Sequence, residues 1–204
     1  SDDKMVTINN GVLLPSIKET PFEIKQKYNL PSNKIIALVG ANLVKRKGHI
    51  YLLEAILQLK MELNQNLPIH FVFAGDGEER NNLIDYIKLN DLGNYVTMLG
   101  HINDIFTLIN ATDILILPYI SHEDFPYIII EAMSLSKPVI GTKVAGIPEQ
   151  IINNINGYLI EPSDSSAIKE ALLKFIYNPI LIENFGAESK KIFNQKFQIK
   201  IGVH

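Results

Sequence analysis

Short apolar runs alternate with longer amphipathic segments through most of the chain, from Asn33 onward. A short apolar run between turn-forming residues is typical of a buried strand, and apolar positions three and four apart indicate a helix. Strands are therefore predicted over residues 35–39, 69–74, 96–99, 114–117, 139–142 and 158–160. Helices are predicted over residues 49–63, 79–89, 103–110, 127–136 and 167–176, the last capped by Asp164 or Ser165. After the helix at 167–176, no further helix that returns along the domain is predicted before residues 197–200, near the end of the chain.

Strands that alternate with helices form repeated βα units, and these units build a parallel sheet. The predicted fold class is therefore α/β, a Rossmann-like doubly wound parallel sheet of about six strands with helices on both faces. Ligands of such folds bind beyond the carboxyl ends of the strands, near the switch in strand order. We expect a site in the loops after the first, second, fourth and fifth strands.

The first thirty residues or so do not show this alternation, and prolines recur at positions 15, 21 and 31. We predict a leading segment or interdomain linker over residues 1–30, and one domain over residues 31–204.

Composition narrows the classes of function. The chain has no cysteine, which excludes disulfides, cysteine metal ligands and thiol nucleophiles. A formal net charge of -3 gives no reason to expect nucleic acid as a partner. The five histidines lack metal-ligand spacing, so no metal site is predicted. No apolar stretch is long enough to span a bilayer, and the first residues do not resemble a signal peptide. We expect a cytoplasmic location, and peripheral association of the intact protein with the inner face of a membrane stays open.

The strongest chemical signal follows the fourth predicted strand, where Glu123 lies in a loop and Glu131 lies eight residues later in an apolar helix. Pro126 suits the first turn of this helix, because its missing N–H would lack a helical partner there. The free N–H groups that follow form a ready site for a diphosphate. A buried carboxylate without partners is costly, and a sugar or ribose diol would supply two donors to Glu131. A structural glutamate, bound to backbone N–H groups or to a lysine, stays open as the alternative.

A second signal follows the first predicted strand, where Lys45, Arg46 and Lys47 precede Gly48. Cationic side chains at this position could stabilise a leaving phosphate. The alternative is a solvated basic loop. The segment is neither a P-loop nor a dinucleotide fingerprint, because neither glycine pattern is present.

Three further loops carry weaker signals. Residues 75–78 form a tight turn after the second strand. Residues 100–104 follow the third strand and could expose backbone groups to a base, although Asp104 could equally cap a helix. Residues 144–149, which include Gly146, suit close backbone approach or simple turn chemistry.

Taken together, the order and spacing of these motifs resemble the C-terminal, donor-binding domain of family-4 retaining glycosyltransferases (glycosyl transferases group 1). Members of that family have two Rossmann-like domains that face each other across a cleft, the GT-B fold. The resemblance covers about residues 6–176. Its matching segments are residues 8–12, 47–48, 73–77, 99–100, 111–118, the pair Glu123 and Glu131, and residues 137–140, 146–149 and 156–160.

The resemblance implies roles for matching positions. Glu131 would bind the ribose hydroxyls of the nucleotide, and Glu123 would contact the transferred sugar. Lys47 would stabilise the departing diphosphate. Residues from Ile102 to Asp104 would lie near the base.

The resemblance also implies that backbone N–H groups around Phe125, Pro126 and Tyr127 hold the sugar and diphosphate. The loop around Gly146 would shape donor selectivity. Members need neither a metal nor a cofactor, and they retain the anomeric configuration.

Two positions depart from the family pattern. Asn42 stands where the family usually has arginine, five residues before Lys47. Arg46 or Lys45 could compensate, but a planar bidentate phosphate contact is not readily replaced. Pro126 stands where many members have glycine, which removes one N–H donor.

We interpret the chain as the donor-binding domain of a retaining hexosyltransferase, excised from a longer protein whose N-terminal acceptor domain is absent from this sequence. The expected donor is a UDP-sugar, with a GDP-sugar as the alternative, and the fragment alone should catalyse little. A sugar-nucleotide epimerase of the same fold and a non-catalytic nucleotide-sugar-binding module are the other readings. The missing glycine fingerprint argues against a nicotinamide dehydrogenase.

Overall fold

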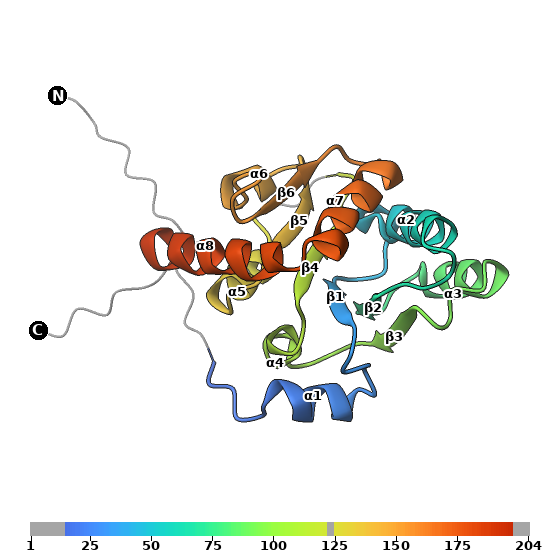
Figure 1. The fold of residues 1–204 in the computed structure, drawn as a ribbon, viewed down its shortest axis with the longest axis horizontal. Helices are drawn as coiled ribbons and strands as arrows, with labels where there is room; N and C mark the ends of the chain where they lie inside the picture. The colour runs from blue at the N-terminus through green and yellow to red at the C-terminus, as the bar shows by residue number, and fades with distance from the viewer. Residues whose placement is uncertain (1–14, 122–124, 198–204) are drawn as a thin grey trace, which may run out of the picture.

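The computed structural model describes residues 15–121 and 125–197 of the chain (Figure 1). Its strands are β1 (Ile35–Gly40), β2 (Ile69–Ala74), β3 (Val96–Gly100), β4 (Ile114–Leu117), β5 (Val139–Thr142) and β6 (Gly157–Ile160). Its helices are α1 (Pro21–Lys27), α2 (His49–Glu62), α3 (Arg80–Leu89), α4 (Ile105–Asn110), α5 (Tyr127–Ser134), α6 (Ile147–Gln150), α7 (Ser165–Tyr177) and α8 (Ile180–Lys196), with a 3-10 turn η1 (Lys45–Lys47) before α2. Every predicted strand is present, within one residue of its predicted bounds.

The strands form one parallel sheet in the order β3-β2-β1-β4-β5-β6. In the register of the central strands, Ala37 of β1 pairs with Phe71 of β2 and Ile114 of β4. The strand order reverses between β1 and β4. The predicted doubly wound α/β sheet is therefore confirmed, with its switch point between these two strands.

Helices cover both faces of the sheet (Figure 1). Helices α2, α3 and α7 pack on one face, in an apolar cluster that includes Leu52, Phe73 and Phe175. Helices α1, α4, α5 and α8 pack on the other face, in a second cluster. Because both faces are covered, the strands carry nearly continuous apolar runs, and β2, β4 and β5 are buried along their whole length.

Most predicted helices are confirmed with small shifts at their ends. The helix predicted from residue 103 begins at Ile105, because the Asp104 carboxylate caps it. Asp164 caps α7 in the same way, accepting a hydrogen bond from the N–H of Ala167 at 2.8 Å. Helix α5 ends at Ser134, two residues earlier than predicted, and Ser136 takes a left-handed backbone (φ 58°).

Helix α8 corrects the prediction that no returning helix follows α7. It has 17 residues and packs along α5 (Figure 1). Gly186 makes this packing close, because a Cβ there would overlap the carbonyl oxygen of Ser136. Two of the buried positions of α8 are Gly186 and Ser189, which interrupt its apolar stripe and hide the helical period in the sequence.

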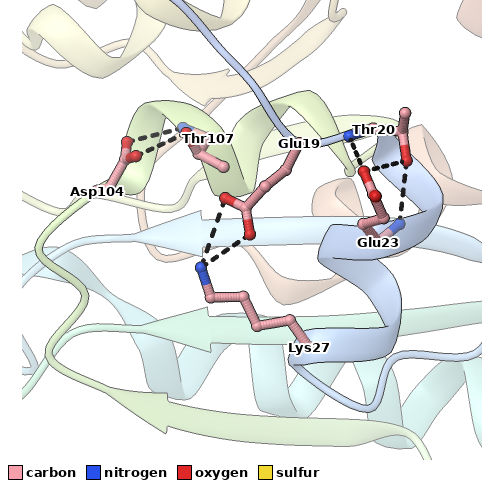
Figure 2. Close-up of polar contacts among 6 residues, drawn as sticks. All are labelled: Glu19, Thr20, Glu23, Lys27, Asp104 and Thr107. Carbon is pink, nitrogen blue, oxygen red and sulfur yellow. Dashed lines mark hydrogen bonds and ion pairs between the residues drawn. The ribbon is translucent and has the colours of Figure 1, made fainter.

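The described part of the predicted leading segment contains α1, which packs against α4. Thr20 and Glu23 cap α1 reciprocally, and Glu19 pairs with Lys27 at 3.1 Å. Figure 2 shows these contacts beside the Asp104 cap of α4. Ile24 of α1 is fully buried in the apolar cluster it shares with α4 and α5. This part of the segment therefore packs into the core of the domain.

His49, the first residue of α2, is a buried imidazole in an apolar setting. It is 2% exposed, and its ring centroid lies 5.6 Å from that of Phe73. Neither ring nitrogen has a hydrogen-bond partner among the described residues. Burial, aided by the charge of Lys47, lowers the pKa of His49 to about 4. The folded chain therefore holds this side chain neutral at neutral pH.

This burial predicts a pH-dependent stability. In the unfolded chain His49 takes up a proton near pH 6.5, but in the folded chain only near its lowered pKa of about 4. Between these values the unfolded state binds more protons, so stability falls as the pH falls, by up to about 3 kcal/mol. His49→Phe should remove this part of the slope in urea unfolding between pH 7 and pH 4.

The exposed His101 provides the control for replacing a histidine by phenylalanine, and only the change in slope that His49→Phe shows beyond that of His101→Phe is assigned to burial of the imidazole. If the slope persists in His49→Phe, the imidazole is not held neutral by the fold.

Candidate functional site

A cavity of about 230 Å³ lies at the carboxyl ends of β1, β2 and β3, next to the switch in strand order. Its lining residues come from the ends of three strands with the loops that follow them and from helices α4 and α5: Gly40, Ala41, Asn42, Ala74, Gly75, His101, Ile102, Ile105 and Ile128. Two predicted site residues, Asn42 and Ile102, thus line one cavity although sixty positions separate them. The wall they share with α5 depends on Gly40, because a Cβ there would lie 2.5 Å from Cδ1 of Ile128.

Glu131 lies one turn beyond Ile128 on α5 and is half-buried. Among the described residues, no hydrogen bond or ion pair reaches its carboxylate. Two lysines that follow α5 or lie on the helix packed along it are engaged elsewhere: Lys137 donates to the carbonyl of Asn110, and Lys190 to that of Ser134. The alternative of a structural glutamate bound to a lysine or to backbone N–H groups therefore finds no support in the geometry.

The electrostatic setting of Glu131 makes its ionised form less favourable than in water. Burial raises the pKa of Glu131, and the negative charge of Asp104 raises it further. Asp104 itself is held ionised, because hydrogen bonds from the Oγ1 and N–H of Thr107 (2.6 and 3.0 Å) lower its pKa. Figure 2 shows this cap. Asp104 thus caps α4, and its negative charge raises the pKa of Glu131.

The first turn of α5 presents backbone groups at the switch point. Tyr127 begins the helix, and Pro126 stands just before it as a buried N-cap without a side-chain hydrogen bond. The ring of Phe125 packs against Phe197, with centroids 6.2 Å apart. The N–H of Ile129 donates to the carbonyl of Pro126 at 3.2 Å. The two N–H groups before it have no partner within the helix, so they are available to an anion. Glu123 lies outside the described residues.

The basic loop after β1 forms the 3-10 turn η1, whose three residues are Lys45, Arg46 and Lys47. Lys47 is buried, and its Nζ lies 3.8 Å from the centroid of the Tyr119 ring. Arg46 is exposed, and its carbonyl accepts a hydrogen bond from the N–H of Ile120 at 2.9 Å. This bond ties η1 to the segment that leads from β4 toward α5. Lys45 lines a separate cavity of about 280 Å³ between α2 and α3.

Gly146 is buried at the N-cap of α6. The two residues before it, Val144 and Ala145, line a further cavity of about 390 Å³ together with Ile120 and Ser121. This cavity lies at the carboxyl ends of β4 and β5, on the opposite side of the switch point from the first.

Three residues of this region were not found from the sequence: Tyr119, Ile105 and Ile128. Tyr119 follows Pro118 at the end of β4, and its contact with Lys47 joins positions more than seventy residues apart. Ile105 and Ile128 form the apolar wall of the first cavity, and each reads in the sequence as an ordinary core position. Only the strand order brings these residues together.

Residues 15–121 and 125–197 contain no group of three or more acidic or histidine side chains placed to hold a metal ion. No helix in that part of the chain is long and apolar enough to cross a membrane.

Residues 21–192 match the family of glycosyl transferases group 1. The chain belongs to this family. It is 33% identical over 208 residues to the human alpha-1,3/1,6-mannosyltransferase, covering 93% of this chain and 49% of that protein. It is 28% identical over 197 residues to the capsular polysaccharide biosynthesis glycosyltransferase CapM of Staphylococcus aureus, covering 95% and 50%. The chain spans about half the length of these relatives.

Solved structures place the fold within this family. The C-terminal domain of a glycosyl transferase group 1 protein from Francisella tularensis matches with a TM-score of 0.77 and 25% identity, covering 90% of this chain and 96% of that domain. A glycosyltransferase from Rickettsia africae matches with a TM-score of 0.83 and 28% identity, covering 97% and 54%. The HepE protein of Anabaena, crystallised with UDP and glucose, shares the fold with a TM-score of 0.78 and 24% identity, covering 87% and 48%. The chain is thus confirmed as one Rossmann-like half of a GT-B fold.

The backbone at Gly48 should be essential for this site. Gly48 has φ 67°, and a Cβ there would overlap the carbonyl oxygen of Pro118 at the end of β4. Gly48→Ala should therefore destabilise the chain by at least about 2 kcal/mol, through left-handed strain and displacement of η1. Chemical unfolding would measure this loss.

Gly93 provides the matched control, because a Cβ there meets nothing within 4 Å. Gly93→Ala should change stability by less than about 0.5 kcal/mol. Equal stability of the two variants would contradict the close approach between η1 and β4.

Proposed function

We propose that this chain is the donor-binding domain of a retaining, metal-independent hexosyltransferase that uses a UDP-sugar. The observation that carries the proposal is Glu131, a half-buried carboxylate without a partner among the described residues, one turn beyond a wall of the switch-point cavity. Leaving such a carboxylate unpaired is costly, and the two hydroxyls of a ribose would satisfy it.

The layout of the site supports a nucleotide-sugar lying across the switch point. The base would occupy the cavity lined by Asn42 and Ile102, with the ribose at Glu131. The diphosphate would then lie at the N-terminus of α5, on the N–H groups around Phe125 and Tyr127. The sugar would extend toward the cavity at Ala145, on the β4–β5 side.

Protein cations would take the place of a metal in this proposal. Lys47 would stabilise the departing diphosphate, and its contact with the Tyr119 ring holds the ammonium next to the β4 loop. Arg46 would add a second cation in the loop where Asn42 offers none. Glu123 would contact the transferred sugar.

Catalysis would require a second domain. The matched relatives are about twice as long as this chain, so the acceptor site is proposed to lie in an N-terminal domain that closes over the donor. This chain should therefore bind a donor and transfer little sugar by itself. HepE, which was crystallised with UDP-glucose, supports UDP as the first nucleotide to test.

Thermal unfolding with nucleotides tests the proposed function directly. UDP at about 100 times its dissociation constant should add about 2.7 kcal/mol of stability to the chain, without added metal. GDP, ADP and NAD at matched concentrations should add less. A shift with NAD and none with any nucleoside diphosphate would contradict the proposal.

Glu131→Gln should separate function from stability. Because the pKa of Glu131 is raised on folding, the folded chain holds more protons than the unfolded chain between the two pKa values, and stability falls as the pH rises through this window. At pH 7 the glutamine variant should therefore be at least as stable as the native chain. It should bind UDP at least about tenfold more weakly, because a charged acceptor for the ribose is lost. Calorimetric titration and thermal unfolding would measure both effects.

Glu183 on α8 is exposed and serves as the control, since Glu183→Gln should bind UDP as the native chain does. If the Glu131→Gln variant unfolds more easily and binds UDP normally, Glu131 has a structural role and does not bind the ribose.

A further inference from the structure

Ala145 adopts a backbone conformation that alanine rarely takes. Its φ is 46°, in the left-handed region where a Cβ crowds the following carbonyl. Eight non-glycine residues of the described chain have positive φ, and the other seven are asparagine, aspartate, glutamine or serine. Asparagine and aspartate tolerate this region better, because their side chains can bond locally to the backbone. Ala145 has no such compensation, and glycine would remove the strain.

The methyl group held in this strained position lines the cavity at the ends of β4 and β5. Two other apolar side chains, Ile120 and Val144, complete the same wall. Ser121 supplies the one polar side chain among the described lining residues. The wall formed by Ile120, Val144 and Ala145 is therefore apolar, at a place where the proposed function puts a sugar.

Part of the backbone of this wall is already hydrogen-bonded. The N–H of Ile120 donates to the carbonyl of Arg46, and the N–H of Val144 donates to the carbonyl of Thr142, both at 2.9 Å. The carbonyl of Val144 accepts from the N–H of Ile147 at 3.2 Å. A sugar hydroxyl pressed against the side chains of Ile120, Val144 and Ala145 would lose its water partners without replacement, because these side chains have no hydrogen-bonding atom, and this loss is costly.

The two loops that carry the wall are also held together. The Oγ1 of Thr142 donates to the carbonyl of Tyr119 at 2.7 Å, which fixes the end of β5 to the end of β4. The two loops that carry the wall are therefore held at a fixed separation where they leave the sheet, and Ala145 is exposed to the cavity between them.

We propose that Ala145 is a specificity-determining residue, and that the donor sugar presents a methyl group to the wall of Ile120, Val144 and Ala145. Two sugar classes carry such a group: a 6-deoxyhexose at C6 and an N-acetylhexosamine at its acetamido group. The inference rests on the proposed function, since it needs a nucleotide-sugar that crosses the switch point. Strain that persists at a ligand-facing position is explained when the side chain serves recognition.

Calorimetric titration of the chain with four ligands tests this inference. The ligands are UDP, UDP-glucose, UDP-6-deoxyglucose and UDP-N-acetylglucosamine. One of the two methyl-bearing donors should bind at least about tenfold more tightly than UDP-glucose, which is the discrimination an apolar pocket gives for one small group. Which of the two binds more tightly identifies the source of the methyl group.

Ala145→Gly removes the methyl group and relieves the backbone strain. It should reduce the preference for the methyl-bearing donor to within about threefold, and it should leave the affinity for UDP unchanged. Asn154→Gly is the matched control, because Asn154 is exposed, has φ 62° and lies outside this cavity. It should keep the full preference. Both glycine variants should stay folded, as thermal unfolding would verify.

Equal affinity of the native chain for all three UDP-sugars would overturn the inference, and so would a preference that persists in Ala145→Gly. In both cases intact UDP binding would leave the proposed function standing. Failure of the native chain to bind UDP would overturn the proposed function and this inference together.

Discussion

The junction between β1 and β4 is the constraint on which the rest of this structure depends. These strands are adjacent in the sheet but distant in sequence, and they join the two halves of the strand order. At one end Asp113 binds the backbone of Ile36 twice, accepting its N–H at Oδ2 (2.7 Å) and donating to its carbonyl (2.8 Å). At the carboxyl end Gly48 lies against Pro118, and η1 is bonded to the β4 loop. Without this contact, the basic loop would not be held beside the segment that leads from β4 to α5.

Two residues near this site have local environments that lower the stability of the domain. Helix α5 is apolar over most of its surface and belongs to the core, yet it carries Glu131 without a partner. Ala145 takes a left-handed backbone that alanine rarely adopts. Both features lower stability in the unliganded domain, and both lie near the switch point where folds of this class place ligands. Such a concentration of unfavourable local choices is expected at a functional site.

Much of the fold could be predicted because its strands are short apolar runs bounded by turns, and these bounds held within one residue. Helix α8 could not, since Gly186 and Ser189 replace apolar residues on its buried face. Its place along α5 follows from the close approach at Ser136, which no local pattern shows. The limits of α4 and α7 depended on whether an aspartate capped the helix, and the sequence offered this only as one alternative.

The sequence by itself determined the fold class and the family, and it proposed the positions that carry chemistry, because apolar period and motif spacing are local properties of the chain. The tertiary structure decided which of these positions meet. It placed Asn42, Ile102 and Ile128 around one cavity and brought the Lys47 ammonium against the Tyr119 ring. It also left Glu131 without a partner among the described residues. These outcomes depend on strand order and on the distances between loops, and neither quantity is encoded in any short stretch of residues.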